Sequence, residues 1–395
     1  MFKELIKEND KKILLLVMDG VGGLPIDGKT TLESAITPNL DKLAKKSSLG
    51  FIDMVSCGIT PGSAPGHLSL FGYDPIEHQV GRGILECLGL DMEVKKGDLA
   101  IRGNFATLKN GIITDRRAGR ISTERNKELL SKLIDKIKNI EDVEIILKSG
   151  KEHRFAAIFR GKGLSDELSD ADPQESGNPP IEAKPLDSKA EKSARLINKF
   201  ISIATDILKG ETDGNTLLIR GFALYPDITP FDKRYKLNSS AIAVYPMYRG
   251  LAKLVGMSII STGESIQDEI DTLKKNIDRY NFFFVHIKKT DSFGEDGNFE
   301  AKKGVIEEVD KFIPAIMEMG FDVICITGDH STPATMSAHS WHPVPVLINS
   351  KYAFEDDGSR FTERECVKGI LGHFKAKELM VLLLANALKL KKFGA

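Results

Sequence analysis

The chain has 395 residues, of which 41% are hydrophobic and 28% are charged, a composition typical of soluble globular proteins. A chain of this length is expected to form two or three domains. Its formal net charge is -1, from 55 basic and 56 acidic side chains. Because so balanced a chain does not attract phosphate backbones or anionic lipids strongly, neither nucleic acid nor a membrane surface is an expected partner.

The cysteines and the N-terminus both point to the cytoplasm. Cys57, Cys87, Cys325 and Cys366 are far apart and form no CxxC pair, which predicts buried, reduced thiols. The apolar run after the charged N-terminus is too short for a signal peptide. No stretch approaches the ~20 apolar residues of a membrane span. The most apolar stretch, 379–388, indicates a buried terminal helix.

Predicted strands and helices alternate near both ends of the chain. In the first hundred residues the pattern indicates a strand at 12–18, a helix at 38–47 and a strand at 50–55. In the last part it indicates helices at 265–279, 299–319, 362–371 and 376–390, and strands at 282–287, 322–327 and 344–348. Such alternation predicts an α/β fold with a doubly wound, mainly parallel sheet.

The middle of the chain has a different pattern. Asn110-Gly111 between two apolar runs is a strong hairpin signal. Further elements are predicted as helices at 123–139 and 188–209 and strands at 143–147, 154–159 and 216–219. The stretch 164–190 is rich in Ser, Asp, Pro and Gly, and is either a functional loop or disordered. We therefore predict an inserted α+β domain at 100–235 within a discontinuous domain formed by 1–99 and 236–395.

Carboxylates and imidazoles follow several of the predicted strands. Asp19, Asp291 and the Asp329-His330 pair each come after an apolar run, and His339 precedes a proline-rich strand. Ligands bind beyond the carboxyl ends of strands in open α/β sheets, so these residues are expected in one pocket. Each of them alone is equally typical of a turn, a helix cap or a surface loop. Together they predict a site for two divalent cations.

Ser63 lies in a Pro-Gly turn that precedes a predicted helix at 68–72. A serine at a helix N-terminus is often only an N-cap, but the free N–H groups there also suit a phosphoryl group. A divalent cation bound to its oxygen would make the hydroxyl a competent nucleophile. The surrounding sequence lacks the GxSxG pattern, which disfavours acyl transfer.

Arginines are candidates for holding an anionic substrate, because the guanidinium fork matches phosphate and carboxylate groups. Any one of them is also typical of a solvated surface. The candidates are Arg116, Arg117, Arg120, Arg154, Arg220 and Arg249. The stretch 81–83 has a Gly-Arg-Gly sequence but lacks the nucleotide-binding patterns GxGxxG and GxxxxGK[ST].

Several of these motifs resemble those of one known family. The stretches at 17–22, 60–75, 288–297, 327–333 and 339–345 resemble the archaeal-type, cofactor-independent phosphoglycerate mutases of the alkaline phosphatase superfamily. The resemblance extends over nearly the whole chain. It implies an alkaline phosphatase-like metal-binding domain with an inserted transferase domain, which agrees with the domain organisation predicted above.

The resemblance also implies a mechanism and its ligands. Ser63 would take the phosphoryl group from 3-phosphoglycerate, and the bound glycerate would reorient and take it back as 2-phosphoglycerate. The implied ligands of two Mn²⁺ or Mg²⁺ ions are, for one, Asp19, Ser63, Asp329 and His330, and for the other, Asp291 and His339. Zn²⁺ is less expected. The two domains would close over the small phosphorylated hydroxy acid and exclude water.

The chain departs from the family pattern at one position. Where the family usually has Gly-His-Asp-Gly, this chain has Glu295 in place of the histidine. We expect Glu295 to ligate through oxygen and to favour harder ions than Zn²⁺. No motif marks the acid–base residue of the inserted domain, for which His153 and Asp115 are candidates.

Three other functions fit the same residues. One is a homoserine kinase-like phosphotransferase, which would need ATP. Another is a phosphatase or phosphomutase acting on another phosphate ester. The third is a binding protein without catalytic activity, which would hold no metal.

Overall fold

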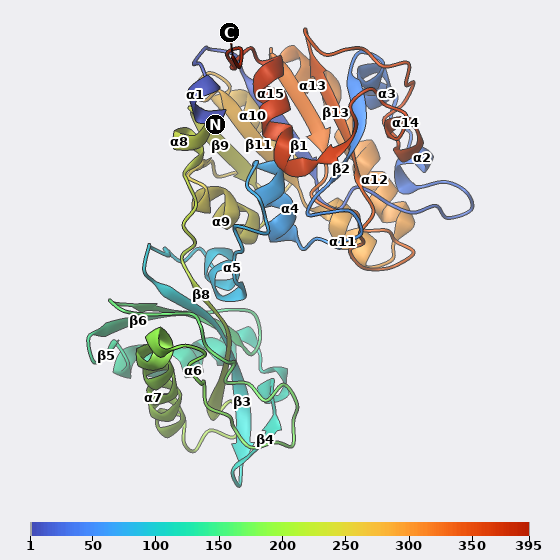
Figure 1. Ribbon diagram of the computed structural model, residues 1–395. Helices are drawn as coiled ribbons and strands as arrows, with labels where there is room; N and C mark the ends of the chain where they lie inside the picture. The colour runs from blue at the N-terminus through green and yellow to red at the C-terminus, as the bar shows by residue number, and fades with distance from the viewer. Residues whose placement is uncertain (1, 395) are drawn as a thin grey trace. The chain divides into compact units, whose positions relative to one another are not determined.

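In the computed structural model, which describes residues 2–394, the chain divides into two units (Figure 1). The large unit contains the residues up to Gln79 and from Ile228 onward, and the inserted unit is Val80–Asp227. The insertion therefore begins about 20 residues earlier than the predicted boundary at 99/100, and ends before the predicted one at 235/236. The earlier start has a physical reason, because α5 (Arg82–Gly89) packs on strands of the inserted unit through buried Ile84 and Cys87.

The large unit is built on an eight-stranded sheet with the order β10-β9-β11-β1-β12-β13-β2-β14. Its strands are β1 (Ile13–Met18), β2 (Ser48–Asp53), β9 (Ser239–Ala243), β10 (Ser258–Ile259), β11 (Phe282–Ile287), β12 (Val323–Thr327), β13 (Val344–Ser350) and β14 (Gly372–Lys375). β13 runs antiparallel to both of its neighbours, and all other neighbouring strands are parallel. The predicted α/β class with a mainly parallel sheet is confirmed.

The central strands are buried along their whole length and are apolar except for His286 of β11 and Thr327 of β12. Every residue of β1, β11 and β12 is buried, as expected for parallel strands that are covered on both faces. β1 lies between β11 and β12, and Val17 is in register with His286 on one side and Thr327 on the other. The segments that follow these three strands therefore all begin at the same end of the sheet, where the carboxyl ends of the strands lie side by side.

Helices connect and cover the strands of this sheet (Figure 1). They are α1 (Phe2–Leu5), α2 (Thr31–Ser34), α3 (Pro38–Ala44), α4 (Ser63–Leu70), α8 (Phe231–Tyr235), α9 (Pro246–Leu254), α10 (Ile266–Asn276), α11 (Lys289–Glu295), α12 (Phe299–Asp310), α13 (Ile313–Glu318), α14 (Glu363–Cys366) and α15 (Leu379–Asn386), with a 3₁₀ turn at Ala376–Glu378 before α15. No helix among residues 2–394 is long and apolar enough to cross a membrane.

Two of the predicted helices are wrong in extent. The helix expected at 299–319 is divided into α12 and α13, because Pro314 lacks an N–H group and suits the first turn of a new helix. The helix expected at 362–371 is limited to α14, and the chain then forms the short edge strand β14. The sequence interpretation also missed β9 and α9, which follow the insertion.

The inserted unit contains a separate, antiparallel sheet with the order β4-β3-β7-β6-β5, in which β8 pairs with β3. Its elements are α5, β3 (Leu99–Lys109), β4 (Ile112–Asp115), a 3₁₀ turn at Ala118–Arg120, α6 (Thr123–Lys136), β5 (Asn139–Ile140), β6 (Val143–Ser149), β7 (Arg154–Arg160), a 3₁₀ turn at Ser188–Ala190, α7 (Glu191–Ile207) and β8 (Thr216–Leu224). Apolar side chains on one face of this sheet form a core with α6 and α7, whereas α5 packs on β3, β7 and β8.

The stretch at 164–190 is an irregular but hydrogen-bonded loop. Ala171 forms a bridge with Ile219 of β8, and the carboxylates of Asp166 and Asp170 accept hydrogen bonds from the backbone of the same strand. These contacts fix the loop along β8. The four cysteines are free, and Cys57 is exposed, contrary to the expectation that all four are buried.

Candidate functional site

Three carboxylates meet where adjacent parallel strands of the large unit end. Asp19 follows β1 directly, Asp291 lies in the first turn of α11 after β11, and Asp329 follows β12. Their exposed fractions are 0%, 1% and 0%. Since β11, β1 and β12 are neighbours in the sheet, the structure brings together residues that are far apart in sequence.

One group that can hold a metal ion consists of Asp19, Asp329 and His330. Nε2 of His330 lies 3.2 Å from Oδ1 of Asp19 and 3.3 Å from Oδ2 of Asp329. These three atoms are buried and have no hydrogen-bond partner. The other oxygens are held by the protein, because Tyr248 donates to Oδ2 of Asp19 at 2.6 Å and the N–H of Gly20 donates to Oδ1 of Asp329 at 3.1 Å. One atom of each residue is thus left for a ligand.

The contacts of Thr332 determine which nitrogen of His330 is free. The hydroxyl of Thr332 lies 2.7 Å from Oδ1 of Asp291 and 2.9 Å from Nδ1 of His330. A hydroxyl has one hydrogen, so if it donates to the carboxylate it must accept from Nδ1–H. Nε2 then carries the lone pair, facing two carboxylate oxygens. Three acceptor atoms so close together repel one another unless a cation lies between them, which fits a divalent metal.

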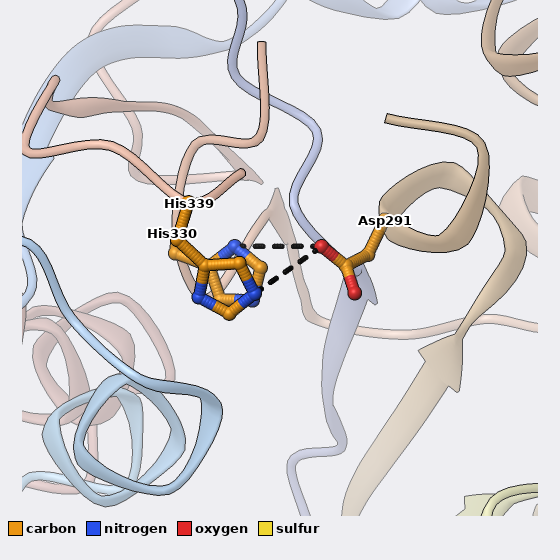
Figure 2. A group of neighbouring side chains, drawn as sticks. All are labelled: Asp291, His330 and His339. Carbon is orange, nitrogen blue, oxygen red and sulfur yellow. Dashed lines mark ion pairs between the residues drawn. The ribbon is translucent and has the colours of Figure 1, made fainter. Parts of the chain in front are cut away.

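A second group that can hold a metal ion contains Asp291, His330 and His339 (Figure 2). Nδ1 of His339 lies 3.0 Å from the carbonyl oxygen of Pro61 and must donate to it, which leaves Nε2 with a lone pair. That nitrogen lies 3.5 Å from Oδ1 of Asp291 and 3.7 Å from Oε1 of Glu295. The rings of His330 and His339 are stacked with their centroids 3.6 Å apart (Figure 2). Because Nε2 of His330 faces the first group, Asp291, His339 and Glu295 are the residues left for a second ion.

Ser63 is the first residue of α4 and lies beside the first group. A Cβ atom added to Gly66 of the same helix would be 2.1 Å from the carbonyl oxygen of Asp329, so only glycine allows this close packing. Burial, followed by the charges of Asp19 and Asp329, raises the pKa of Tyr248 well above its ordinary value, and a hydrogen bond with Ser63 opposes this shift. Tyr248 thus connects Ser63 to Asp19.

Two histidines lie beneath these groups and were not expected from the sequence. Nδ1 of His67 lies 2.8 Å from the carbonyl oxygen of Ser63 and 3.2 Å from Oδ2 of Asp329, while Nε2 of His286 lies 3.3 Å from Oδ2 of Asp19. Burial lowers the pKa of His67 to about 4, so its ring is neutral at neutral pH. With Tyr248, the two rings form an aromatic layer below the carboxylates.

The ionisation of the two carboxyls in the first group differs. Burial opposes the ionisation of Asp19, but its contact with His286 holds the pKa well below its ordinary value. Burial raises the pKa of Asp329 to about 8, and the neighbouring Asp19 carboxylate also raises it. A divalent cation bound here would favour the ionised form of both.

Lys288 supplies a positive charge next to both groups. Its ammonium lies 3.1 Å from Oδ2 of Asp19 and also pairs with Oδ2 of Asp291. Burial lowers the pKa of Lys288, but the two carboxylates outweigh burial and raise the pKa above its ordinary value. The ammonium is therefore charged and has carboxylate partners from each group. The sequence signal was the Lys-Lys pair before Thr290-Asp291, which the sequence interpretation did not use.

In the inserted unit, arginines gather on the sheet face opposite the α6 and α7 core. Arg102 of β3 is in register with Arg220 of β8, and Asn104 of β3 is in register with Arg154 of β7. Burial lowers the pKa of Arg102, Glu86 opposes this, and the charges of the neighbouring arginines lower it further. We call this surface the arginine face, and it consists of Arg82, Arg102, Arg154 and Arg220.

The arginine face contains buried polar atoms without partners. Nε of Arg102, Nε of Arg220, Oδ1 of Asn104 and Nδ1 of His153 have no hydrogen-bond partner. The nearest carboxylates form only long ion pairs, with Oε2 of Glu86 3.5 Å from Nε of Arg102 and Oδ2 of Asp172 3.9 Å from Nε of Arg220. Burial, then the charge of Arg154, lowers the pKa of His153 to about 4. Unsatisfied buried donors are costly, so their presence here indicates a surface that binds an anion.

The other predicted site residues of the inserted unit have different surroundings. Asp115 accepts hydrogen bonds from the backbone N–H groups of Arg117 and Gly119, so both of its oxygens stabilise a turn. Arg116 makes a bidentate pair with Asp172, at 3.0 and 2.7 Å. Arg117 and Arg120 are exposed at this turn. Arg116 borders the arginine face, because Oδ2 of Asp172 lies 2.7 Å from Nη2 of Arg116 and 3.9 Å from Nε of Arg220.

Arg249 belongs to the large unit rather than the inserted one. It lies on α9 and donates to the carbonyl oxygen of Val244 at 2.7 Å. Arg102 and Arg82 were missed in the sequence interpretation, since each lies alone among apolar or small residues. The register of an antiparallel sheet, which the sequence alone does not reveal, places Arg102 beside Arg220, and the packing of α5 on β8 brings Arg82 next to Gly221.

Comparisons with known proteins agree with this geometry. A family model described as 2,3-bisphosphoglycerate-independent phosphoglycerate mutase matches residues 44–212. A protein of Aquifex aeolicus, named as a probable enzyme of this kind, is 56% identical, and the match covers 99% of each chain. A protein of Thermotoga maritima with the same name is 55% identical, and the match covers 99% of this chain and 98% of the relative.

Solved structures give the same picture. A protein of Pyrococcus horikoshii is 31% identical with a TM-score of 0.81, and the match covers 98% of this chain and 99% of that one. A cofactor-independent phosphoglycerate mutase of Thermoplasma acidophilum is 31% identical with a TM-score of 0.80. That match covers 95% of this chain and 100% of the solved one. The similarity therefore includes both units.

Proposed function

Since the chain belongs to the 2,3-bisphosphoglycerate-independent phosphoglycerate mutase family, we propose that it interconverts 3-phosphoglycerate and 2-phosphoglycerate. The observation that carries this proposal is Ser63, which begins a helix beside buried carboxylates and an imidazole whose partnerless atoms suit a metal. Such an enzyme is an isomerase, and we assign it a cytoplasmic role in glycolysis and gluconeogenesis. The full-length relatives favour this function over homoserine phosphorylation.

The donor set supports two divalent ions. Asp19, Asp329 and His330, with the hydroxyl of Ser63, would hold one, and Asp291 and His339 would hold the other, with Glu295 as a further oxygen ligand. When bound, the ions would stabilise the serine alkoxide and neutralise the charge of the phosphoryl group. Because most of these donors are carboxylate oxygens, Mn²⁺ and Mg²⁺ fit better than Zn²⁺.

The reaction needs two phosphoryl transfers through Ser63. Its oxygen attacks the phosphorus of 3-phosphoglycerate, the bond from phosphorus to O3 breaks, and O3 takes up a proton. After the glycerate reorients, its O2 loses its proton and attacks the phosphorus of the phosphoserine, the bond from phosphorus to Oγ of Ser63 breaks, and the product leaves as 2-phosphoglycerate. Free backbone N–H groups at the start of α4 favour the negative charge that builds up on the phosphoryl oxygens.

Tyr248 and Lys288 support this chemistry from the large unit. Tyr248 keeps a hydrogen bond to Ser63 and another to Asp19, which orients the nucleophile and one carboxylate together. Lys288 stays protonated, so its ammonium adds positive charge near the reacting phosphoryl group. Both residues therefore stabilise the negative charge of the transfer step.

The arginine face supports binding of the substrate's anionic groups. Two buried guanidinium N–H groups there, on Arg102 and Arg220, form no hydrogen bond and only long ion pairs with Glu86 and Asp172, so a substrate carboxylate or phosphate could bind them more closely. His153 is the candidate for moving a proton to or from the substrate hydroxyls, because it is neutral at neutral pH and Nδ1 has no partner. Asp115 is a poorer candidate, since the backbone occupies both of its oxygens.

The proposal is tested with 3-phosphoglycerate and Mn²⁺, with 2,3-bisphosphoglycerate omitted. Phosphorus NMR should show 2-phosphoglycerate growing at the expense of the substrate until equilibrium, with no inorganic phosphate. Release of inorganic phosphate alone would identify a phosphatase instead. A parallel sample with homoserine and ATP should show no new phosphate ester, and its appearance would favour the kinase-like function.

A further inference from the structure

Lys302 of α12 is a buried charge that the chemistry above does not use. Its exposed fraction is 0%, whereas its neighbour Lys303 pairs with Glu300 on the surface. Burial lowers the pKa of Lys302 to about 8, which leaves it mostly protonated at neutral pH. A lysine buried in the charged form is costly unless all of its donors are satisfied, so its retention needs a reason.

The three donors of Lys302 are all used by backbone carbonyls. Its ammonium donates to the carbonyl oxygens of Gly20 at 2.7 Å, Gly22 at 3.1 Å and Thr332 at 2.8 Å. An ammonium has three N–H groups, so its donor capacity is filled. These acceptors belong to two segments, one after β1 and one after β12, and the head group of Lys302 links both of them to α12.

The same two segments also interlock with each other. The N–H of Thr332 lies 3.2 Å from the carbonyl oxygen of Gly20 and 3.0 Å from that of Gly22, and Val21 forms a bridge with Ser331. A Cβ atom at Gly20 would lie 2.4 Å from Oγ1 of Thr332, so the approach requires glycine. The segments at 20–22 and 331–332 are therefore closely packed, and the ammonium of Lys302 donates hydrogen bonds to both of them.

These segments carry the ligands of both candidate metal groups. Asp19 directly precedes Gly20, and His330 lies two residues before Thr332. The hydroxyl of Thr332 also holds Oδ1 of Asp291, the carboxylate of the second group. A shift of Thr332 or Gly20 would therefore move ligands of both groups at once.

We propose that Lys302 is a positioning residue that sets the metal affinity of both groups by holding the segments at 20–22 and 331–332 together. The inference rests on the proposed metal sites and adds a residue that touches neither ion. The buried carboxyl of Glu363 is the largest charge acting on Lys302, followed by those of Asp291 and Asp19, so its positive charge also offsets part of the repulsion between the last two. Residues that orient metal ligands from behind typically change metal affinity about 10- to 100-fold when they are removed.

The test is a titration with Mn²⁺ alone, without substrate, in which the resonance of free Mn²⁺ is followed by electron paramagnetic resonance. The variants are Lys302→Met, whose unbranched side chain fills a similar space without donors, and Lys302→Gln, which keeps a donor but loses the charge. Lys303→Met is the matched control, because it removes a lysine from the neighbouring surface position. Thermal unfolding in the presence of a chelator measures the stability of each metal-free protein.

We expect Lys302→Met to weaken the binding of both Mn²⁺ ions about 10- to 100-fold, Lys302→Gln to weaken it less, and Lys303→Met to bind like the wild type. Equal Mn²⁺ affinity in Lys302→Met and Lys303→Met would overturn the inference, even if Lys302→Met were less stable. If Lys302→Met does not fold, the Mn²⁺ affinity of Lys302→Gln is compared with that of Lys303→Met, and equal affinities again overturn the inference. A wild-type protein that binds no Mn²⁺ would instead reject the metal sites themselves.

Discussion

The candidate metal centre and the arginine face leave opposite kinds of atoms without partners. In the large unit, Oδ1 of Asp19, Oδ2 of Asp329 and Nε2 of His330 are buried acceptors. In the inserted unit, Nε of Arg102 and Nε of Arg220 are buried donors. Because buried polar groups without hydrogen-bond partners are costly, each unit carries a candidate binding surface, one with acceptors suited to a cation and the other with donors suited to an anion.

The two surfaces are also built by different means. The acceptors lie on segments that follow adjacent parallel strands. The carboxyl ends of these strands lie side by side, which brings the acceptors together. The donors lie within antiparallel strands and meet through register, as the pairing of Arg102 with Arg220 shows. Ends of parallel strands can be recognised in a sequence, but the register of two strands that are more than 100 residues apart cannot. We therefore predict that substitutions in the arginine face do not change metal binding, and that substitutions in the candidate metal site do not change the arginine face.

The largest effect is expected in the large unit, from Ser63→Ala. Removal of the attacking oxygen should lower kcat by at least about 10⁴-fold, because no other group can accept the phosphoryl group. The measurement is the rate of 2-phosphoglycerate formation, with Mn²⁺ binding recorded in parallel. Ser69→Ala, on the same helix, is the control and should keep wild-type kcat. A Ser63→Ala protein with kcat within tenfold of the wild type would show that another residue is the nucleophile.

Arg102→Met and Arg220→Met should break the anion-binding surface and spare the metal centre. Each removes a charged hydrogen bond of about 1.5–3 kcal/mol, so kcat/KM should fall roughly 10- to 150-fold. Mn²⁺ affinity, measured without substrate, should not change. Arg195→Met, which removes an exposed arginine paired with Glu141 on the same unit, serves as the control. Unchanged kcat/KM in both variants would remove the arginine face from the substrate site.

His153 should give the inserted unit a pH dependence of its own. Its folded pKa is about 4, mainly because of burial, whereas an unfolded histidine titrates near 6.5. The unfolded chain therefore binds more protons between these values, and the stability present above pH 6.5 is lost as the pH falls toward 4, by roughly 1.4 kcal/mol per pH unit. We expect the unfolding free energy to fall less steeply in His153→Gln than in the wild type over this window. If the unfolding free energy of His153→Gln and of the wild type fell equally steeply with pH, the lowered pKa of His153 would be contradicted.

The smallest effect is expected at Glu295, at the edge of the metal centre. Its side chain is about half exposed, so Glu295→Gln should weaken Mn²⁺ binding by roughly tenfold or less. Glu295→His adds an imidazole and should shift the preference from Mn²⁺ and Mg²⁺ toward Zn²⁺. Metal titrations of binding and of activity measure both changes, with Asp296→Asn as the neighbouring control. An unchanged metal preference in Glu295→His would show that Glu295 is not a ligand.

Much of the large unit could be predicted from local sequence patterns. The strand at 282–287 has its predicted bounds, whereas the helix predicted at 68–72 begins earlier, at Ser63, and ends at Leu70. Such features depend on neighbouring residues, because continuous apolar runs and turn residues determine local conformation. Where a local pattern misled, as at 299–319, a single proline was the cause.

The positions of the supporting residues depend on tertiary structure. Arg102 reaches Arg220 by strand register, Tyr248 and His286 form a layer under Asp19, and Lys302 meets carbonyls from two distant segments. The motifs at 17–22, 60–75, 288–297, 327–333 and 339–345 were enough to predict the family and to mark the candidate ligands, since a metal needs particular side chains at strand ends. The residues that hold these ligands in place are ordinary in sequence. Only packing decides which lysine is buried and which tyrosine faces a carboxylate, because burial and hydrogen bonding are properties of the folded chain.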